Sequence, residues 1–167
     1  MINLGAKRLV LLSRSGKVPY EGQGLEEQLR WLLEESGADV RVMRCDVSDE
    51  SSVVSMLESV RSMEGWEGGI EGIVHSVGVL RDAMIRGGGA ASGALEVWNA
   101  KAYSAYLLDK HTTCDNLRLF LCFSSITAAV GNIGQSSYGA ANAYLEGLMA
   151  ARRQGGRPGL CLSLIHI

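Results

Sequence analysis

The sequence predicts an α/β fold built on a doubly wound parallel β-sheet. Short runs rich in leucine and β-branched residues alternate with longer segments of helical periodicity, which is the pattern of repeated strand–helix units. The length of 167 residues suits one domain with one core. A composition of 47% hydrophobic and 20% charged residues is that of an ordinary globular protein, so most of the chain is expected to fold.

Five strands are expected, each a short apolar run bounded by turn residues. They are residues 8–13, 39–45, 69–74, 117–123 and 160–164. Right-handed crossovers between such strands give an open sheet of the Rossmann type, whose ligands bind at the carboxyl ends of the strands. Functional residues are therefore expected directly after each strand.

Helices are expected between these strands. Two apolar stripes at helical spacing consist of Leu25, Leu29, Leu32 and Leu33, and of Val53, Val54, Leu57 and Val60. Asp49 or Ser48 can cap the second of these helices. Longer helices are expected over about residues 94–110 and 138–153, the latter ended by Gly155, Gly156 and Pro158, and residues 87–89 are expected to form a loop.

Both ends of the chain depart from a complete fold of this kind. Such a fold opens with a strand, a glycine-rich turn and a helix, whereas residues 1–6 resemble the last turn of that helix. We therefore expect the first strand and the glycine-rich turn to be missing. Residues 162–167 resemble an in-frame translation of a sequencing adapter, with a genuine short tail as the alternative, so His166 is given no functional role.

The charge balance and the cysteines exclude several functional classes. With 16 basic and 18 acidic residues the formal net charge is -2, so no overall attraction to nucleic acid or to an anionic membrane is expected. No apolar run approaches a membrane span, and no signal peptide is evident. The cysteines lack C-x-x-C spacing and are expected to be free thiols rather than disulfides or metal ligands. We expect a soluble, cytoplasmic protein without a metal site.

Residues that follow the first three strands are candidates for nucleotide binding. Arg14 stands where an arginine accommodates the 2′-phosphate of NADP, although a solvated surface arginine is the alternative. Asp46 could accept a hydrogen bond from adenine or cap the next helix, for which Asp49 is better placed. Gly78 would let a flat ligand lie against the backbone. His75 is interpreted as structural, because no nucleophile or carboxylate is evident beside it.

The fourth strand and the helix after it carry the strongest catalytic pattern. Ser125 comes at the end of the strand and Tyr138 opens the helix, so both can converge on one pocket at the carboxyl edge of the sheet. Asn142 is at i+4 from Tyr138 on the same helix face. Structural roles are individually commoner for such residues, but asparagine has a low propensity for the middle of a helix.

Together with Lys101, these residues resemble the active-site tetrad of the ketoreductase domains of polyketide and fatty-acid synthases, in the short-chain dehydrogenase superfamily. Simple members of that superfamily usually carry lysine four residues after the tyrosine and asparagine on the earlier helix. Here the two have exchanged places, which is typical of the synthase domains. The resemblance also includes the runs 11–16, 45–47, 79–83 and 151–158.

The resemblance implies NADPH-dependent reduction of a β-ketoacyl group carried on an acyl carrier protein. Tyr138 would give the proton to the carbonyl oxygen, and Ser125 would orient that carbonyl. Lys101 would favour the ionised phenol and hold the cofactor ribose, while Asn142 would position Lys101 or a water in a proton relay. The implied cofactor-binding residues are Ser13, Arg14, Asp46, Val47, Ser76, Gly78, Lys101 and Tyr138.

The same resemblance makes residues 1–161 a partial ketoreductase domain and residues 162–167 a non-native tail. Its implied partners are the carrier protein and other synthase domains, with no nucleic acid and no membrane. Leu80, Arg81 and Asp82 partly match a Leu-Asp-Asp signature of ketoreductases that give D-hydroxy products, and Val130 stands where the opposite class often has tryptophan.

Two other functions stay open. One is a non-catalytic structural domain of this family, against which the intact tetrad weighs. The other is a free-standing short-chain dehydrogenase acting on a small alcohol, against which the exchanged lysine and asparagine weigh. Because the glycine-rich turn supplies the backbone donors for the pyrophosphate, the chain as written is expected to bind NADPH weakly and to be inactive.

Overall fold

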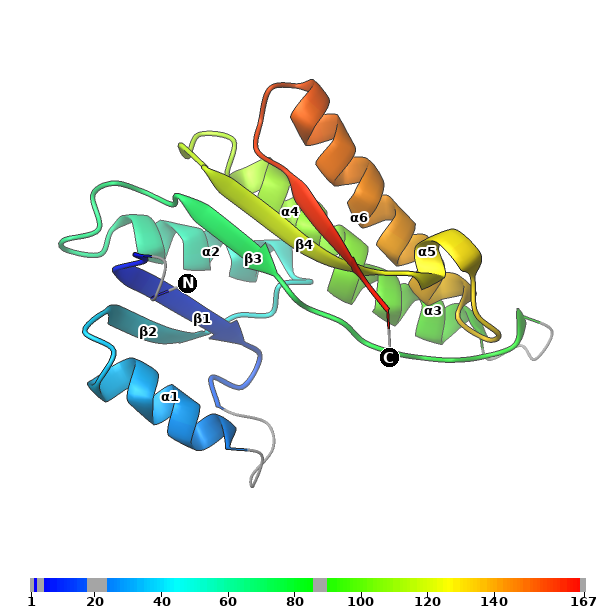
Figure 1. The fold of residues 1–167 in the computed structure, drawn as a ribbon, viewed down its shortest axis with the longest axis horizontal. Coiled ribbons are helices and arrows are strands. Elements are labelled where there is room, and N and C mark those ends of the chain that lie inside the picture. Colours follow the sequence, from blue (N-terminus) through cyan, green and yellow to red (C-terminus); the bar gives the residue numbers. More distant parts are fainter. Residues whose placement is uncertain (1, 3–4, 18–23, 86–89, 166–167) are drawn as a thin grey trace. The chain divides into compact units, whose positions relative to one another are not determined.

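The computed structural model describes residues 2, 5–17, 24–85 and 90–165 (Figure 1). His166 and the predicted loop at 87–89 lie outside the described residues. Where the length suggested one core, the chain divides into two compact units, Met1–Trp66 and Glu67–Ile167. The strands of each unit pair only with one another among the described residues, so most tertiary contacts form within a unit.

The first unit pairs two parallel strands. Its elements are β1 (Arg8–Ser13), α1 (Leu25–Glu34), β2 (Asp39–Arg44) and α2 (Glu50–Arg61). The ladder runs from Arg8 opposite Asp39 to Ser13 opposite Arg44, so both strands end at the same edge. This places the residues after β1 and β2, which the sequence singled out for nucleotide binding, at one end of the unit.

The two helices of the first unit differ in how far their apolar stripes are buried. The carboxylate of Asp49 accepts hydrogen bonds from the backbone N–H groups of Ser51 and Ser52, which confirms it as the N-cap of α2. Val53, Leu57 and Val60 of α2 are buried as the stripe predicts, together with Met56, whereas Val54 of the stripe is half-buried. None of the residues of α1 is buried, so its leucine stripe forms a helix without being enclosed.

The second unit is a three-stranded parallel sheet in the order β3-β4-β5 with helices packed on it (Figure 1). Its strands are β3 (Gly72–His75), β4 (Leu119–Ser125) and β5 (Leu160–Leu164). Its helices are α3 (Ala90–Trp98), a π-helical turn (Asn99–Tyr103), α4 (Ser104–His111), α5 (Thr127–Val130) and α6 (Ser136–Gln154). The long helix expected over about 94–110 is thus present as α3, the π-helical turn and α4, one after another.

The core of the second unit lies between its central strand and the helices. Because β4 is flanked by β3 and β5, its inward side chains are completely covered, and Phe120 and Cys122 have no exposed surface. Leu107 of α4 and Leu145 and Met149 of α6 are equally buried. All four cysteines are free thiols in the structure, with Cys45 and Cys122 buried, Cys161 half-buried and Cys114 exposed. No helix of the described residues is long and apolar enough to cross a membrane.

The strand bounds agree with the sequence for β1 and β5. β2 ends at Arg44, one residue earlier than expected, and β3 and β4 differ more, β4 beginning at Leu119 rather than at residue 117. β3 begins at Gly72 rather than at residue 69, because Gly69 has a left-handed φ of 70° that turns the chain before the ladder begins. β4 extends to Ser125, since Ser124 and Ser125 pair with Ser163 and Leu164 of β5. The serines after the apolar run therefore belong to the strand itself.

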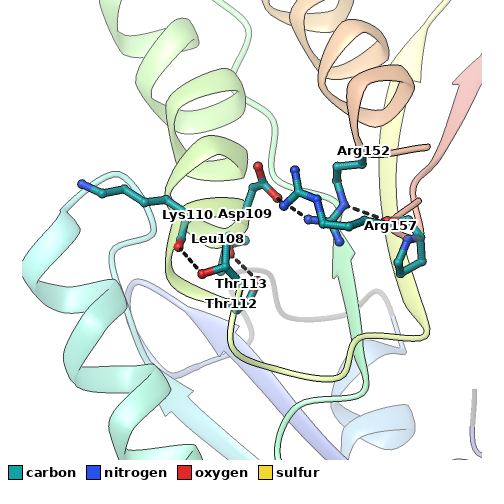
Figure 2. A network of polar contacts seen from close by, with 8 residues as sticks. Leu108, Asp109, Lys110, Thr112, Thr113, Arg152 and Arg157 are labelled. Atoms are coloured by element: carbon teal, nitrogen blue, oxygen red, sulfur yellow. Dashed lines mark hydrogen bonds and ion pairs between the residues drawn. The ribbon is translucent and has the colours of Figure 1, made fainter. Parts of the chain in front are cut away.

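A buried ion pair connects α4 to the end of α6 (Figure 2). The guanidinium of Arg152 bonds the carboxylate of Asp109 and donates from Nε to the carbonyl of Pro158 at 2.7 Å. Arg157 reaches the same carboxylate at 2.8 Å. Arg152 also lies 4.6 Å from the centre of the Phe120 ring, a favourable position for a cation. These contacts fix the C-terminal half of α6 against α4 and β4.

Candidate active site

Ser125 lies where the sequence predicts it, at the carboxyl end of the central strand. Its side chain is buried, and its Oγ accepts a hydrogen bond from the backbone N–H of Thr127 at 3.3 Å. The neighbouring Ser124 points to the other face of the strand and donates to a carboxylate oxygen of Glu146 at 2.6 Å. The strand thus separates two serines that are adjacent in sequence, and Ser124 is tied to α6.

Lys101 lies on the π-helical turn and is almost fully buried, with 4% of its surface exposed. Its ammonium donates to the carbonyl of Phe123 at 2.8 Å and to that of Val77 at 3.4 Å. These carbonyls belong to β4 and to the segment after β3, so the charge is at the carboxyl ends of two neighbouring strands. Burial lowers the pKa of Lys101 from its usual value, because the charged form loses hydration.

Tyr138 and Asn142 lie on the first two turns of α6. Tyr138 packs against a buried cluster of Val97, Ala102 and Ala141, which joins α6 to α3 and the π-helical turn. Gly139 allows α6 to approach α5 closely, since a Cβ there would be 3.1 Å from the carbonyl oxygen of Thr127. The ring of Tyr138 is therefore held between three helical elements.

The structure brings Lys101 and Tyr138 together. The Nζ atom of Lys101 is 5.5 Å from the centre of the Tyr138 ring, within the range of a cation–π contact. Because Lys101 also bonds the carbonyl of Phe123, its charge lies close to the strand end that carries Ser125. Lys101 thus contacts Tyr138 and is bonded to the strand that ends at Ser125, all within the second unit.

Asn142 is bonded within its own helix rather than directly to Lys101. Its amide nitrogen donates to the backbone carbonyl of Tyr138 at 3.0 Å, and no hydrogen bond joins it to Lys101 among the described residues. The side chain is fully buried, and its Oδ1 has no hydrogen-bond partner within the described part of the chain. An unpaired acceptor in a buried site is costly, so this atom is suited to bind a water or a ligand hydroxyl.

The cofactor-binding residues predicted after β1 and β2 lie at the expected strand ends of the first unit. Arg14 is exposed, and the Oγ of Ser13 accepts a hydrogen bond from the backbone of Gly16 at 2.9 Å. Asp46 is exposed, and its hydrogen bonds from Ser48 hold the pKa of that carboxyl below its usual value. Val47 is half-buried. Asp46 therefore organises its own turn and leaves the capping of α2 to Asp49.

The residues after β3 are more closely tied to the tetrad. Ser76 and Gly78 are exposed, and a Cβ at Gly78 would meet no atom within 4 Å, so the backbone there is open to a ligand. His75, in contrast, is buried, and its Nε2 is 2.7 Å from the hydroxyl of Ser104. Sequence reasoning did not connect Ser104 with His75; the available signal was a small polar residue three positions after Lys101.

A second set of contacts that the sequence did not predict pins the loop before Tyr138. The side chain of Gln135 donates to the carboxylate of Asp82 at 3.0 Å, and the backbone N–H of Ala83 donates to the carbonyl of Gly134, also at 3.0 Å. Arg81 forms a bidentate ion pair with Glu96 of α3. The segment that departs from the Leu-Asp-Asp pattern is therefore attached both to α3 and to the entry of α6.

Comparison with known proteins places the chain in a family. The sequence matches the KR domain over residues 1–167. It is 36% identical over 159 residues to the polyketide synthase GfsA of Streptomyces halstedii, an alignment that covers 95% of this chain and 2% of that protein. It is 37% identical over 161 residues to the pikromycin polyketide synthase component PikAII of Streptomyces venezuelae, covering 95% of this chain and 4% of that protein. The chain therefore spans a small part of these relatives.

Solved structures agree with the sequence comparison. The ketoreductase from the first module of phoslactomycin biosynthesis in Streptomyces sp. HK803 superposes with a TM-score of 0.81 at 32% identity, over 95% of this chain and 34% of that one. The first ketoreductase of the tylosin polyketide synthase gives a TM-score of 0.79 at 32% identity, over 95% and 32%. These neighbours confirm the Rossmann-like α/β fold predicted from the sequence. Because the family match extends over all 167 residues, the chain belongs to the KR domains, the ketoreductase oxidoreductases of polyketide synthases.

Proposed function

We propose that this chain, within the protein at its natural full length, supplies the active site that reduces a β-ketoacyl group, carried as a thioester on an acyl carrier protein, to the β-hydroxyacyl group with NADPH. The observation that carries the proposal is the buried ammonium of Lys101, 5.5 Å from the ring centre of Tyr138 and bonded to the strand that ends at Ser125. A proton donor, a cation and a second hydroxyl are what reduction of a ketone requires, because negative charge develops on the carbonyl oxygen.

Tyr138 is the proton donor in this proposal. When the phenol gives up its proton it becomes an anion, and the ammonium of Lys101 stabilises that anion. The stabilisation is stronger in a buried site than in water, because the surroundings screen the two charges less. Lys101 therefore promotes the chemistry through the position of its charge, which the carbonyls of Phe123 and Val77 fix.

Ser125 supplies a hydrogen bond to the same carbonyl oxygen. Its Oγ accepts from Thr127, and within the described residues its own hydrogen has no acceptor, so the hydroxyl is free to donate. The partner at Thr127 holds the oxygen in place while the hydrogen points elsewhere. A buried donor of this kind stabilises developing charge at little cost of reorganisation.

The residues present fit a nicotinamide cofactor. When bound, NADPH supplies the hydride. Two carbonyls accept from the Lys101 ammonium, which has three N–H donors, so one donor remains for a ribose hydroxyl. The open backbone at Gly78 and the unpaired Oδ1 of Asn142 give further room and a further acceptor. In the first unit, exposed Arg14 supplies a charge suited to a 2′-phosphate.

The carrier-bound substrate is inferred from the setting of the relatives. GfsA and PikAII are polyketide synthases of which a KR domain is a small part, and such assemblies contain other synthase domains as partners. The proposed partners of this chain are accordingly an acyl carrier protein and neighbouring synthase domains. The exchanged positions of Lys101 and Asn142 favour this setting over a free-standing dehydrogenase of small alcohols.

The test is NADPH oxidation with a β-ketoacyl thioester by the protein at its natural full length, compared with its Tyr138→Phe variant. Removal of the proton donor is expected to lower kcat by about 10²- to 10⁴-fold while the Kd for NADPH stays unchanged. Fluorescence titration of NADPH gives the Kd, and loss of NADPH absorbance gives the rate. A wild-type protein that binds NADPH and never oxidises it with the thioester would favour the structural, non-catalytic alternative.

A further inference from the structure

His75 is a buried ionisable side chain that the proposed reaction does not use. It is the last residue of β3 and has 2% of its surface exposed. Its Nε2 lies 2.7 Å from the hydroxyl oxygen of Ser104, the residue that follows the π-helical turn carrying Lys101. The same hydroxyl oxygen is 2.6 Å from the carbonyl of Ala100 and 3.2 Å from the carbonyl of Lys101.

These distances assign the hydrogen atoms. A hydroxyl has one hydrogen, and a carbonyl can only accept, so the hydrogen of Ser104 is directed to the carbonyls of Ala100 and Lys101. The Nε2 of His75 must then carry a hydrogen and donate it to Ser104. Burial, together with the nearby charge of Lys101, lowers the pKa of His75 to about 4, so the ring is neutral at pH 7. The distances around Ser104 assign the single hydrogen of this neutral ring to Nε2.

The π-helical turn explains why a hydroxyl is needed at this point. The backbone N–H of Ser104 bonds to the carbonyl of Asn99, five residues back, whereas in an α-helix it would bond to the carbonyl of Ala100. The hydroxyl of Ser104 reaches the Ala100 carbonyl instead. A chain of hydrogen bonds therefore leads from β3, through His75 and Ser104, to the backbone of the turn.

We propose that His75 and Ser104 are positioning residues, which hold the π-helical turn so that the Lys101 ammonium stays at the Phe123 carbonyl and beside Tyr138. The cost of the arrangement supports a role beyond packing. The Nδ1 of His75 is buried with no hydrogen-bond partner among the described residues, and a buried unpaired acceptor is unfavourable compared with an apolar side chain of similar shape. The functional consequence rests on the proposed NADPH-dependent reduction.

The first test measures the turn itself, without cofactor. Hydrogen–deuterium exchange is followed in peptides covering residues 99–104 of the full-length protein. His75→Leu and Ser104→Ala are expected to raise the exchange rate there about tenfold or more, while residues 145–154 of α6 stay unchanged. His75→Gln, which restores a side-chain N–H donor near the Nε2 position, is expected to return the rate towards that of the wild type.

Thr112→Val is the matched control. Thr112 is also buried, and its hydroxyl donates to the carbonyl four residues back, that of Leu108 at 2.6 Å, at the far end of α4 from Lys101. Deleting this hydroxyl removes the same kind of bond without touching the π-helical turn. Exchange over 99–104 is expected to be unaffected by this substitution.

The second test asks whether His75 acts through Lys101. In the wild-type background, His75→Leu is expected to raise the Kd for NADPH about tenfold and to lower kcat about tenfold. The KM for the thioester is expected to stay within about twofold of the wild-type value. In the Lys101→Ala background the same substitution is expected to change the Kd by less than about twofold, because the group it positions is already absent. Ser104→Ala gives an independent measurement if His75→Leu does not fold.

The outcomes separate the two proposals. Equal losses on His75→Leu in both backgrounds, exchange over 99–104 that stays at the wild-type rate, or a Thr112→Val variant as impaired as Ser104→Ala would each overturn the positioning role. Failure of the wild-type protein to oxidise NADPH with the thioester would overturn the proposed reaction alone, because the exchange measurement needs neither cofactor nor substrate.

Discussion

At the scale of single residues, the site depends on where charge is buried. Lys101 and His75 are both enclosed, and the charge of Lys101 disfavours a positive charge on His75. The ammonium of Lys101 is bonded to two carbonyls, whereas the ring of His75 has a neutral hydroxyl as its neighbour. The lysine therefore keeps hydrogen-bond acceptors for its charged form, and the histidine is suited to stay neutral.

This difference predicts an acid-sensitive stability. His75 has a pKa of about 4 in the folded chain against about 6.5 when unfolded, so between these values the unfolded chain binds more protons. The free energy of unfolding is expected to have its full value above pH 6.5, where His75 is neutral in both states. It is expected to fall by up to about 3 kcal/mol as the pH drops to 4. Urea denaturation over this range measures it. His75→Gln is expected to flatten the slope, and an unchanged slope in that variant would refute the assignment.

At the scale of helices and strands, the buried ion pair of Figure 2 predicts unequal effects of two substitutions. Asp109→Ala leaves the guanidinium of Arg152, whose side chain is 3% exposed, without its counter-ion, and is expected to cost about 3 kcal/mol of unfolding free energy. Arg157→Ala removes a partner that is 43% exposed and is expected to cost less than about 1 kcal/mol. Urea denaturation of both variants measures the two losses of unfolding free energy. Equal losses would show that the buried pair of Arg152 with Asp109 does not hold α6 in place.

The sequence predicted most of the elements and could not predict the π-helical turn. Apolar periodicity located all five strands and the cap at Asp49, because these depend on local composition and on one side chain. The difference between α-helical and π-helical hydrogen bonding over Asn99–Tyr103 is set by tertiary contacts, here those of Ser104 with His75. The exposure of α1 could not be predicted either, because an apolar stripe predicts a helix but not whether another element covers it.

At the scale of the whole molecule, the candidate residues divide between the two compact units. Lys101, Ser125, Tyr138 and Asn142 all belong to the second unit, while Ser13, Arg14, Asp46 and Val47 belong to the first. All four residues proposed for proton donation and carbonyl binding therefore belong to one unit. Spacing and family resemblance predicted the tetrad, but the unpaired Oδ1 of Asn142 among the described residues and the contacts of Asp82 with Gln135 required the three-dimensional structure.

The most direct measurement of the central claim is the transfer of deuterium from NADPH labelled at its hydride position to a β-ketoacyl thioester. The protein at its natural full length is incubated with both compounds, and the hydroxyacyl product is analysed by mass spectrometry. One deuterium is expected on the β-carbon of the product, and product formation is expected to be lost in Tyr138→Phe. A folded protein that binds NADPH and yields no deuterated β-hydroxyacyl product would contradict it.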